Sequence, residues 1–374
     1  MKICIVVRIL WPGGVQRIAL AEAEGLRKLN NNVDLVFLRA TEGTFFNSKV
    51  NYKILFNGDV NSKILSRIFR KITMYYSPER GKNATVDLDL IWKFQRSLEK
   101  YDVIYYFDEF SSFFQKHRRK KMGFKTVVLI HEVSLLSKSR LIKYVQRKAV
   151  RNCDLVLTNT LENLKLLKNY GIENSEEVYP GLYVHENIPT FEERSNIAIS
   201  VTLWDSGRKP EYFLEIARKI ESGKIILAGS WTDFEYFNNF KEQINTLGLS
   251  SKITITGSIN EEELNELYKK SKVSIRFGYF EKGPGMGSLE SISWAIPLII
   301  NSGIGIKEVV RENVNGYIVD QSDTDKIAVL IEDLFINKEK WNKISLNNAN
   351  LAKDLSWEEH CLKLNSILQN LLSK

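Results

Sequence analysis

Cysteine is scarce in this sequence: its 374 residues include three, Cys4, Cys153 and Cys361, which lie far apart along the chain. An odd and scattered set matches neither a disulfide framework nor the paired spacing of a zinc site. Reduced cysteines fit a protein of the cytoplasm. We therefore expect a cytoplasmic protein, with peripheral contact to the inner face of the membrane.

Long hydrophobic runs are also missing. The longest apolar stretches, such as Ile225–Ala228 and Leu298–Ile300, are far shorter than the roughly 20 residues that a membrane-spanning helix needs. The N-terminal run Met1–Val7 is interrupted by Arg8 and followed by a glycine turn. We expect this run to be a buried first strand rather than a signal peptide.

An acidic metal-binding motif at the end of a strand is a third absence. Asp87-Leu88-Asp89 has the letters of an Asp-x-Asp motif, but it opens an amphipathic helical pattern. We expect no metal site and no resident cofactor.

Acidic residues are few between residues 61 and 151, where 21 Lys and Arg face 8 Asp and Glu. Lys116–Lys121 is the densest part of this basic region. Three interpretations stay open: a solvated loop face, a surface for anionic lipid or an anionic acceptor, and nucleic-acid binding. We favour the anionic membrane surface through residues 61–151 and expect no nucleic-acid partner.

The apolar periodicity predicts two successive α/β halves. In the first, Lys2–Val7, Val33–Leu38, Val103–Phe107, Thr126–Ile130 and Leu155–Leu157 are strand candidates. A basic, aromatic insertion is expected at about 57–86. The first strand, its glycine turn, a helical pattern and the next strand form a βαβ unit, which predicts a parallel sheet.

A second series of βα units begins near residue 196. Its strand candidates are Ile197–Val201, Lys224–Leu227, Ile253–Ile255, Val273–Ile275 and Pro297–Ile300. Helices fit at Pro210–Ile220, Phe234–Leu247, Glu261–Lys270, Ser288–Trp294 and Ser356–Leu372. We expect two Rossmann-like domains, at 1–185 and at 195–355, and a C-terminal helix at 356–374.

Polar and glycine residues follow several expected strands, where open α/β sheets bind their ligands. Gly13-Gly14 follows the first strand and opens a helix, which suits a phosphate as well as a plain tight turn. His131 directly follows Thr126–Ile130, and it is either a structural residue or a site residue. Arg208 and Lys209 follow Ile197–Val201, and they either clamp a diphosphate or belong to an exposed turn.

The richest segment is Gly283–Glu290, which has three glycines at alternate positions between a strand and a helix. Its N–H groups suit phosphate oxygens. We expect Glu290 in the first helical turn, where a carboxylate is stabilised and can accept hydrogen bonds from two ribose hydroxyls.

These motifs resemble those of the retaining group 1 (family 4) glycosyltransferases. The family's signature has three parts. Gly283–Glu290 is similar to the first, E-x-F-G-(L/M)-x-x-x-E. Trp294–Ile299 is similar to the second, G-x-P-V-I, and Gly303–Val310 contains the third, E-V-V. Asn315–Val319 resembles the family's N-G-x-L-V, and Tyr179-Pro180-Gly181 a variant of I-P-N-G.

The resemblance implies a GT-B fold: two Rossmann-like domains facing each other across a cleft, with the C-terminal helix at 356–374 crossing back to the N-terminal domain. It also implies that the domain at 1–185 binds the acceptor and the domain at 195–355 binds the nucleotide-sugar donor. It implies transfer of a sugar from a UDP- or GDP-linked donor to a glycan, lipid-linked or protein-linked acceptor. The catalytic residues implied are His131, Arg208, Lys209 and Glu281. The donor-binding residues implied are Gly13, Gly14, Lys282, Gly283, Gly285, Met286, Gly287, Ser288, Leu289 and Glu290.

The chain departs from the family pattern at two places. The first signature glutamate falls on Lys282, and Glu281 is its neighbour. The arginine of the family's phosphate pair falls on Leu203 or Trp204, while Lys209 fits the lysine and Arg208 lies beside it.

Lys282 also supports an alternative, a catalytically impaired sugar-nucleotide-binding protein or partner of another transferase. A phosphorylase or epimerase on two Rossmann domains and a nucleic-acid-binding protein are further alternatives.

Overall fold

The computed structural model of the chain describes residues 1–10, 13–40, 50–56, 94, 98, 100–112, 123–133, 140–278 and 283–374. Several sequence expectations lie outside these ranges. They are the insertion at 57–86, the motif Asp87–Asp89 with most of the helical pattern that it opens, the basic run 116–121, and the site candidates Glu281 and Lys282.

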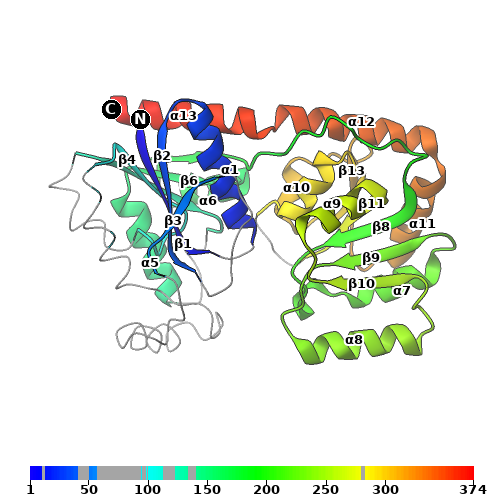
Figure 1. The fold of residues 1–374 in the computed structure, drawn as a ribbon. Coiled ribbons are helices and arrows are strands. Elements are labelled where there is room, and N and C mark those ends of the chain that lie inside the picture. Colours follow the sequence, from blue (N-terminus) through cyan, green and yellow to red (C-terminus); the bar gives the residue numbers. More distant parts are fainter. Residues whose placement is uncertain are drawn as a thin grey trace. The chain divides into compact units, whose positions relative to one another are not determined.

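The chain divides into two compact units. Unit 1 comprises Met1–Gly181 and Trp357–Lys374, and unit 2 comprises Leu182–Ser356. The chain therefore passes between the units twice, after Gly181 and after Ser356. Each unit contains its own parallel sheet (Figure 1).

The sheet of unit 1 has the strand order β3-β2-β1-β4-β5-β6-β7, and all of its pairings are parallel. Its strands are β1 (Lys2–Leu10), β2 (Asn32–Ala40), β3 (Tyr52–Ile54), β4 (Val103–Tyr106), β5 (Lys125–Ile130), β6 (Leu155–Thr158) and β7 (Ser175–Glu177). The described helices are α1 (Gly14–Lys28), α5 (Arg140–Asn152), α6 (Leu161–Asn169) and α13 (Trp357–Ser373).

Helices cover both faces of this sheet. Alternate side chains of a strand point to opposite faces of a sheet. On one face, Tyr106 of β4 belongs to the core cluster that includes Val145 and Ala149 of α5. On the other side α1 packs against α13, where Glu22 and His360 are both buried (Figure 1).

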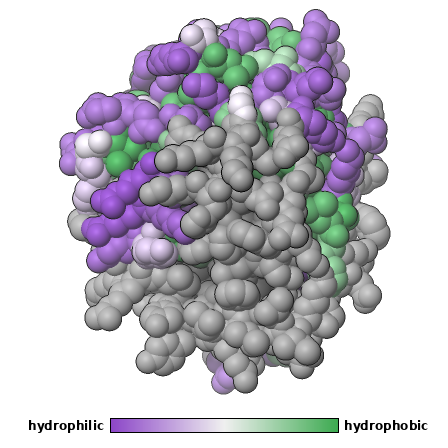
Figure 2. All heavy atoms as spheres, turned by 90° about the vertical axis from the view of Figure 1, so that its left-hand side faces the viewer, coloured by the Kyte–Doolittle hydropathy of each residue, from purple (hydrophilic) through white to green (hydrophobic). Residues whose placement is uncertain are grey.

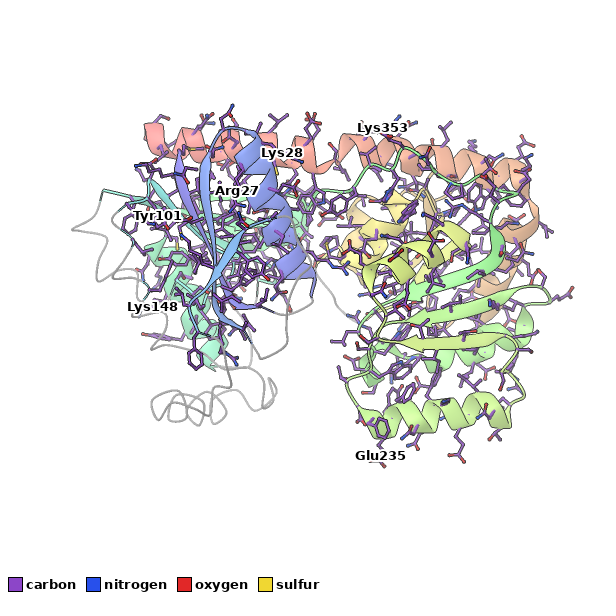
Figure 3. All side chains as sticks on the ribbon, viewed as in Figure 1. Arg27, Lys28, Tyr101, Lys148, Glu235 and Lys353 are labelled. Atoms are coloured by element: carbon purple, nitrogen blue, oxygen red, sulfur yellow. The ribbon has the colours of Figure 1, made fainter. Side chains whose placement is uncertain are left out.

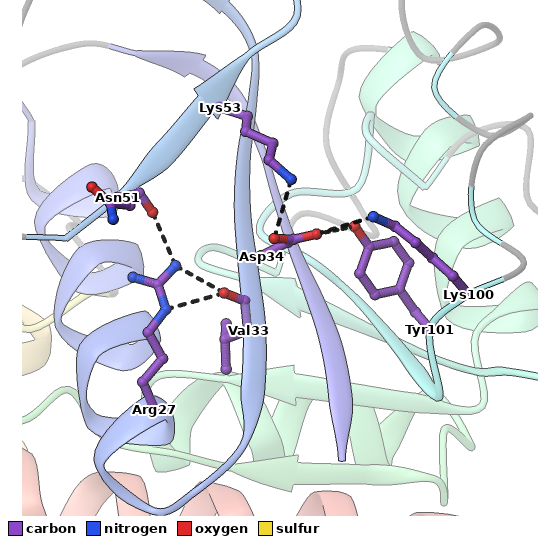
Figure 4. A network of polar contacts seen from close by, with 7 residues as sticks. All are labelled: Arg27, Val33, Asp34, Asn51, Lys53, Lys100 and Tyr101. Carbon is purple, nitrogen blue, oxygen red and sulfur yellow. Dashed lines mark hydrogen bonds and ion pairs between the residues drawn. The ribbon is translucent and has the colours of Figure 1, made fainter.

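A polar network at the amino-terminal edge of the same sheet joins β2 to its neighbours (Figure 4). The Arg27 guanidinium donates to the carbonyl oxygens of Val33 and Asn51 at 2.8 and 2.9 Å. The Asp34 carboxylate accepts from a tyrosine hydroxyl and two lysines. These three donors are Tyr101, Lys53 and Lys100. Because ligands bind at the carboxyl edge of such sheets, we assign the network to structure rather than to the site.

Unit 2 repeats the arrangement, with the order β10-β9-β8-β11-β12-β13 and parallel pairing throughout. Its strands are β8 (Ser195–Val201), β9 (Lys224–Ala228), β10 (Ile253–Gly257), β11 (Ser271–Arg276), β12 (Leu298–Asn301) and β13 (Gly316–Val319). Its α-helices are α7 (Glu211–Lys219), α8 (Phe234–Thr246), α9 (Glu261–Lys270), α10 (Met286–Ser293), α11 (Thr324–Ile336) and α12 (Lys338–Asp354).

Two cores flank the sheet of unit 2. One gathers side chains of α7, α8 and α11, including Phe213, Phe240 and Leu334, and the other gathers Leu264 and Tyr268 of α9. Helices on both faces of a parallel sheet make each unit Rossmann-like. The expected α/β fold class with two Rossmann-like domains is confirmed. Among the described helices, none has both the length and the hydrophobicity needed to cross a bilayer.

The strands expected from apolar runs are all present, with ends shifted by one to three residues. Sequence reasoning missed β3 and β7, which have three residues each and lie at the two edges of their sheet. It also missed β13, α6, α11 and α12. Strands β3 and β7 bury little apolar surface, so their pairing rather than their composition defines them.

Candidate functional site

The strand order of each unit contains a topological switch point, the position where successive strands begin to add on the opposite side. In unit 2 it lies between β8 and β11. A crevice at the carboxyl ends of these strands is the usual ligand site of such a sheet. The loop holding Arg208 and Lys209 follows β8, and the loop leading to Glu290 follows β11.

Gly285 is the N-cap of α10 and adopts a φ of +70°, a conformation that strongly favours glycine. Gly287 lies so close to β8 that a Cβ there would be 2.7 Å from the carbonyl oxygen of Val201. The first turn of α10 therefore lies directly against the end of β8. The N–H groups of Ser288 and Leu289 donate to the Gly285 carbonyl at 3.1 and 3.3 Å. The N–H groups of Met286 and Gly287 precede them at the helix N-terminus and would face an anion bound at this end.

Glu290 is the fifth residue of α10, so it lies in the second helical turn. The expectation that it lies in the first turn was wrong, because the helix begins at Met286 rather than at Ser288. One carboxylate oxygen, Oε2, accepts a hydrogen bond from the Tyr268 hydroxyl at 2.9 Å. The same hydroxyl is 3.2 Å from the carbonyl oxygen of Gly287.

Arg208 and Lys209 occupy a short 3-10 turn, Ser206–Arg208, and the residue after it. The Asp205 side chain caps this turn by accepting a hydrogen bond from the Arg208 backbone N–H at 3.1 Å. Lys209 is exposed and has a left-handed backbone with φ of 51°. The loop thus presents two cations at the carboxyl end of β8.

In unit 1 the switch point lies between β1 and β4. Gly13 is the N-cap of α1, directly after β1, with an extended backbone that does not by itself require glycine. Gln16 in the first turn donates to the Ile9 carbonyl at 2.9 Å and joins α1 to the strand end. Gly13 and Gly14 are therefore at the helix N-terminus predicted for them.

His131 directly follows β5, and its Nε2 is 3.1 Å from the carbonyl oxygen of Phe107, the residue after β4. A carbonyl oxygen only accepts, so Nε2 carries the hydrogen. Burial lowers the pKa of His131, outweighing the Asp108 charge and the Phe107 hydrogen bond, which raise it. The imidazole is therefore neutral at pH 7, and its Nδ1 is a hydrogen-bond acceptor.

Two residues that position these candidates, one in each unit, were missed by sequence reasoning. Asn163 of α6 is fully buried, donates to the carbonyl oxygen of His131 at 3.1 Å, and accepts from the Val133 N–H. Arg276, at the end of β11, donates to the Val201 carbonyl and has its guanidinium beside Gly285. No sequence signal distinguished Asn163, because its partners are about 30 residues away; Arg276 had one, a cation ending an apolar strand.

Metal binding has no support among the described residues, where no group of three or more His, Cys, Asp or Glu side chains is arranged to hold an ion. Glu281, expected as a catalytic residue, and Lys282, expected as a donor-binding residue, are outside the described ranges. The described candidates therefore lie at the carboxyl ends of strands at or next to the switch point of each unit. They are Gly13, Gly14 and His131 in unit 1, and Arg208, Lys209 and Gly283–Glu290 in unit 2.

Two family models match the chain, one for each half. The model of glycosyltransferase family 4 matches residues 12–184, and that of the glycosyl transferases group 1 matches residues 184–351. An uncharacterised glycosyltransferase of Methanocaldococcus jannaschii is 27% identical over 153 residues, which are 40% of this chain and 38% of that protein. The aligned part thus spans less than two fifths of that relative.

Solved structures resemble the whole chain in fold. The Anabaena protein HepE, in complex with UDP and glucose, has a TM-score of 0.76 at 15% identity and covers 99% of this chain and 100% of its own. Sucrose-phosphate synthase from Thermosynechococcus elongatus has a TM-score of 0.76 at 16% identity, covering 100% and 99%. With a family model on each Rossmann-like half, the chain belongs to the group 1 glycosyltransferases.

Proposed function

We propose that this chain moves a sugar from a nucleoside diphosphate sugar, UDP- or GDP-linked, to a hydroxyl of a glycan or lipid-linked glycan, with retention at the anomeric carbon. One observation carries the proposal: at the switch point of unit 2, Gly285 caps α10 and Glu290 follows one turn behind. A helix N-terminus for phosphate with a nearby carboxylate for ribose suits a nucleotide. The UDP and glucose in HepE support the same ligand class.

The cations of unit 2 have a role in leaving-group departure. Breaking the bond between the anomeric carbon and the phosphate oxygen leaves negative charge on the diphosphate. Arg208, Lys209 and the N–H groups at the start of α10 would stabilise that charge in the transition state. A bond from the acceptor oxygen forms on the same face of the sugar, and the acceptor proton passes to the departing phosphate oxygen. This route retains the configuration without a separate base.

His131 suits a contact with the transferred sugar. Its Nε2–H is used by the Phe107 carbonyl, so Nδ1 is the nitrogen that can accept a sugar hydroxyl. A neutral ring adds no positive charge beside an anomeric carbon that itself becomes positive. Gly13 and Gly14 would bring the N-terminus of α1 to the diphosphate.

A thermal-shift and turnover assay with UDP, GDP and their sugars tests this function. A ligand at 100 times its Kd stabilises the folded state by about 2.7 kcal/mol. We expect one nucleotide to raise Tm by several degrees. Glu290→Ala should lose most of the shift, while Glu235→Ala, at an exposed position of α8 (Figure 3), should keep it. If no nucleotide raises Tm, the proposal is wrong.

Turnover separates the enzyme from the impaired binding protein. We expect the bound nucleotide sugar to be consumed, by transfer or slow hydrolysis, and NMR of the product to show the donor's anomeric configuration. Binding without consumption across the acceptor panel would favour the binding protein. An inverted product would contradict the retaining mechanism alone.

The acceptor side of the proposal includes contact of unit 1 with an anionic membrane. Helix α5 contains Lys143, Arg147, Lys148 and Arg151 and no acidic residue, and its Tyr144 is 57% exposed. A basic amphipathic helix with an exposed aromatic ring suits an anionic interface, at about 1 kcal/mol for each cation near the lipid. On the face shown in Figure 2 the described surface is mostly hydrophilic, with apolar side chains in small groups.

Vesicle sedimentation tests this contact. We expect the protein to bind vesicles containing phosphatidylglycerol and not those of phosphatidylcholine alone. The double variant Arg147→Glu/Arg151→Glu should bind at least about tenfold more weakly. Lys343→Glu/Lys353→Glu changes the net charge equally but lies on α12 of unit 2, so it should bind as the wild type does. If both double variants bind the vesicles equally weakly, the effect is one of net charge and the proposed contact through α5 is wrong.

A further inference from the structure

Tyr268 occupies an unusual position for a polar side chain of unit 2. It lies near the end of α9, is fully buried, and packs its ring in the cluster with Leu264 and Ile296. Its hydroxyl extends from this apolar cluster to α10. There it is 2.9 Å from Glu290 Oε2 and 3.2 Å from the Gly287 carbonyl oxygen.

We infer that Tyr268 is a positioning residue that orients the Glu290 carboxylate for the ribose diol of the donor; this rests on the proposed donor-binding role of Glu290. A glutamate has three side-chain torsions, and ordering them costs free energy when ligand binds. A hydrogen bond to the ionised carboxylate, made before the ligand arrives, reduces that cost. It uses one of about four lone-pair positions of the carboxylate.

The backbone beneath this pair is held by a separate group, Arg194. This buried guanidinium donates to the carbonyl oxygens of Tyr268 at 2.9 Å, Ser271 at 2.7 Å and Trp294 at 2.7 Å. It therefore links the C-terminal ends of α9 and α10. Because these contacts do not involve the Tyr268 hydroxyl, Tyr268→Phe removes the hydrogen bond and leaves both the ring and the helix ends in place.

The rival interpretation is that the hydroxyl only contributes to folding. The two interpretations differ in how Tyr268→Phe changes the affinity for ligands with and without ribose hydroxyls. A lost fold contact weakens the binding of every nucleotide equally. A disordered carboxylate weakens the binding of only those ligands that carry the 2′ and 3′ hydroxyls. A 2′,3′-dideoxynucleoside diphosphate is therefore the ligand that separates them.

The experiment is calorimetry with UDP or GDP, whichever binds the wild type, and with its 2′,3′-dideoxy form. We expect the wild type to prefer the ribose form by about tenfold or more. In Tyr268→Phe this preference should fall about fivefold, with the Kd of the dideoxy form unchanged. Tyr236→Phe is the matched control, because the Tyr236 hydroxyl bonds the Glu211 carboxylate between α8 and α7. It should keep the full preference.

Each contrary result has its own meaning. A Tyr268→Phe protein that keeps the wild-type preference overturns the inference and leaves the proposed function standing. Equal weakening of both ligands shows a purely structural hydroxyl and also overturns it. A wild type that binds the nucleotide without preferring ribose rejects the role of Glu290, and with it the inference. A wild type that binds no nucleotide rejects the proposed function itself.

Discussion

At the scale of single residues, His131 shows how burial and one hydrogen bond define a chemical state. Position after a strand made it a candidate in the sequence, but its tautomer depends on Phe107, 24 residues away, and its charge on burial. Burial lowers its pKa below the usual 6.5. The unfolded chain therefore binds a proton more readily than the folded protein does. The contribution of His131 to the free energy of unfolding is therefore fully present above pH 6.5, and it is lost as the pH falls below that value.

Urea denaturation of the wild type and His131→Gln at pH 7.5, 6.5 and 5.5 measures this effect. We expect the wild type to lose stability relative to the variant on acidification, because only the wild type gains a charge that the folded protein disfavours. A difference between the two proteins that is constant over this range would contradict the lowered pKa of His131.

At the scale of elements, the contact between α1 and α13 is held by a buried ionisable pair. His360 Nε2 is 3.0 Å from Glu22 Oε1, and both side chains are at most 3% exposed. His360 Nδ1 also lies 2.7 Å from the Tyr179 carbonyl oxygen. Both ring nitrogens thus face oxygen atoms, and removing the ring leaves a buried carboxylate without this partner.

His360→Ala should lower the free energy of unfolding by about 3–5 kcal/mol, because breaking a buried pair leaves an uncompensated group. Lys363→Ala is a control on the same helix, since Lys363 pairs with Glu177 at 2.9 Å but is 51% exposed. An exposed pair contributes about 0–1 kcal/mol. Equal losses in the two variants would show that the His360 pair is not stabilising α13.

At the scale of the whole molecule, the two chain passages between the units lie side by side. The Leu182 N–H donates to the Leu355 carbonyl at 2.7 Å within unit 2. Within unit 1, a Cβ on Gly181 would be 2.7 Å from Trp357 Cα, so only glycine fits against α13. The last 18 residues of the chain thus complete unit 1 although unit 2 separates them from it in sequence.

Truncation after Ser356 tests this organisation by hydrogen exchange. Removing α13 exposes Glu22 and the apolar side of α1, so amides of α1 should lose most of their protection. Amides of α9 and α10 should exchange at wild-type rates, because their packing is internal to unit 2. Removal of Ser373 and Lys374 alone should change neither. Loss of protection throughout unit 2 would contradict the division of the chain.

The sequence by itself determined the features that depend on neighbours along the chain. Buried strands are continuous apolar runs, glycines mark the loops after β1 and β11, and the order of βα units requires parallel sheets. These local patterns placed Gly13, His131, Arg208 and Gly283–Glu290 at strand ends, and the strand orders then placed those ends beside the two switch points.

The tertiary structure alone decided which side chains meet. Tyr268 and Glu290 are 22 residues apart, and Glu22 and His360 are 338 apart. Periodicity assigns both Tyr268 and His360 to buried helix faces, where an apolar residue would satisfy the same pattern. Their hydrogen-bond partners come from other helices, and that choice depends on how helices pack around each sheet. Packing brings together residues whose spacing along the chain carries no common signal.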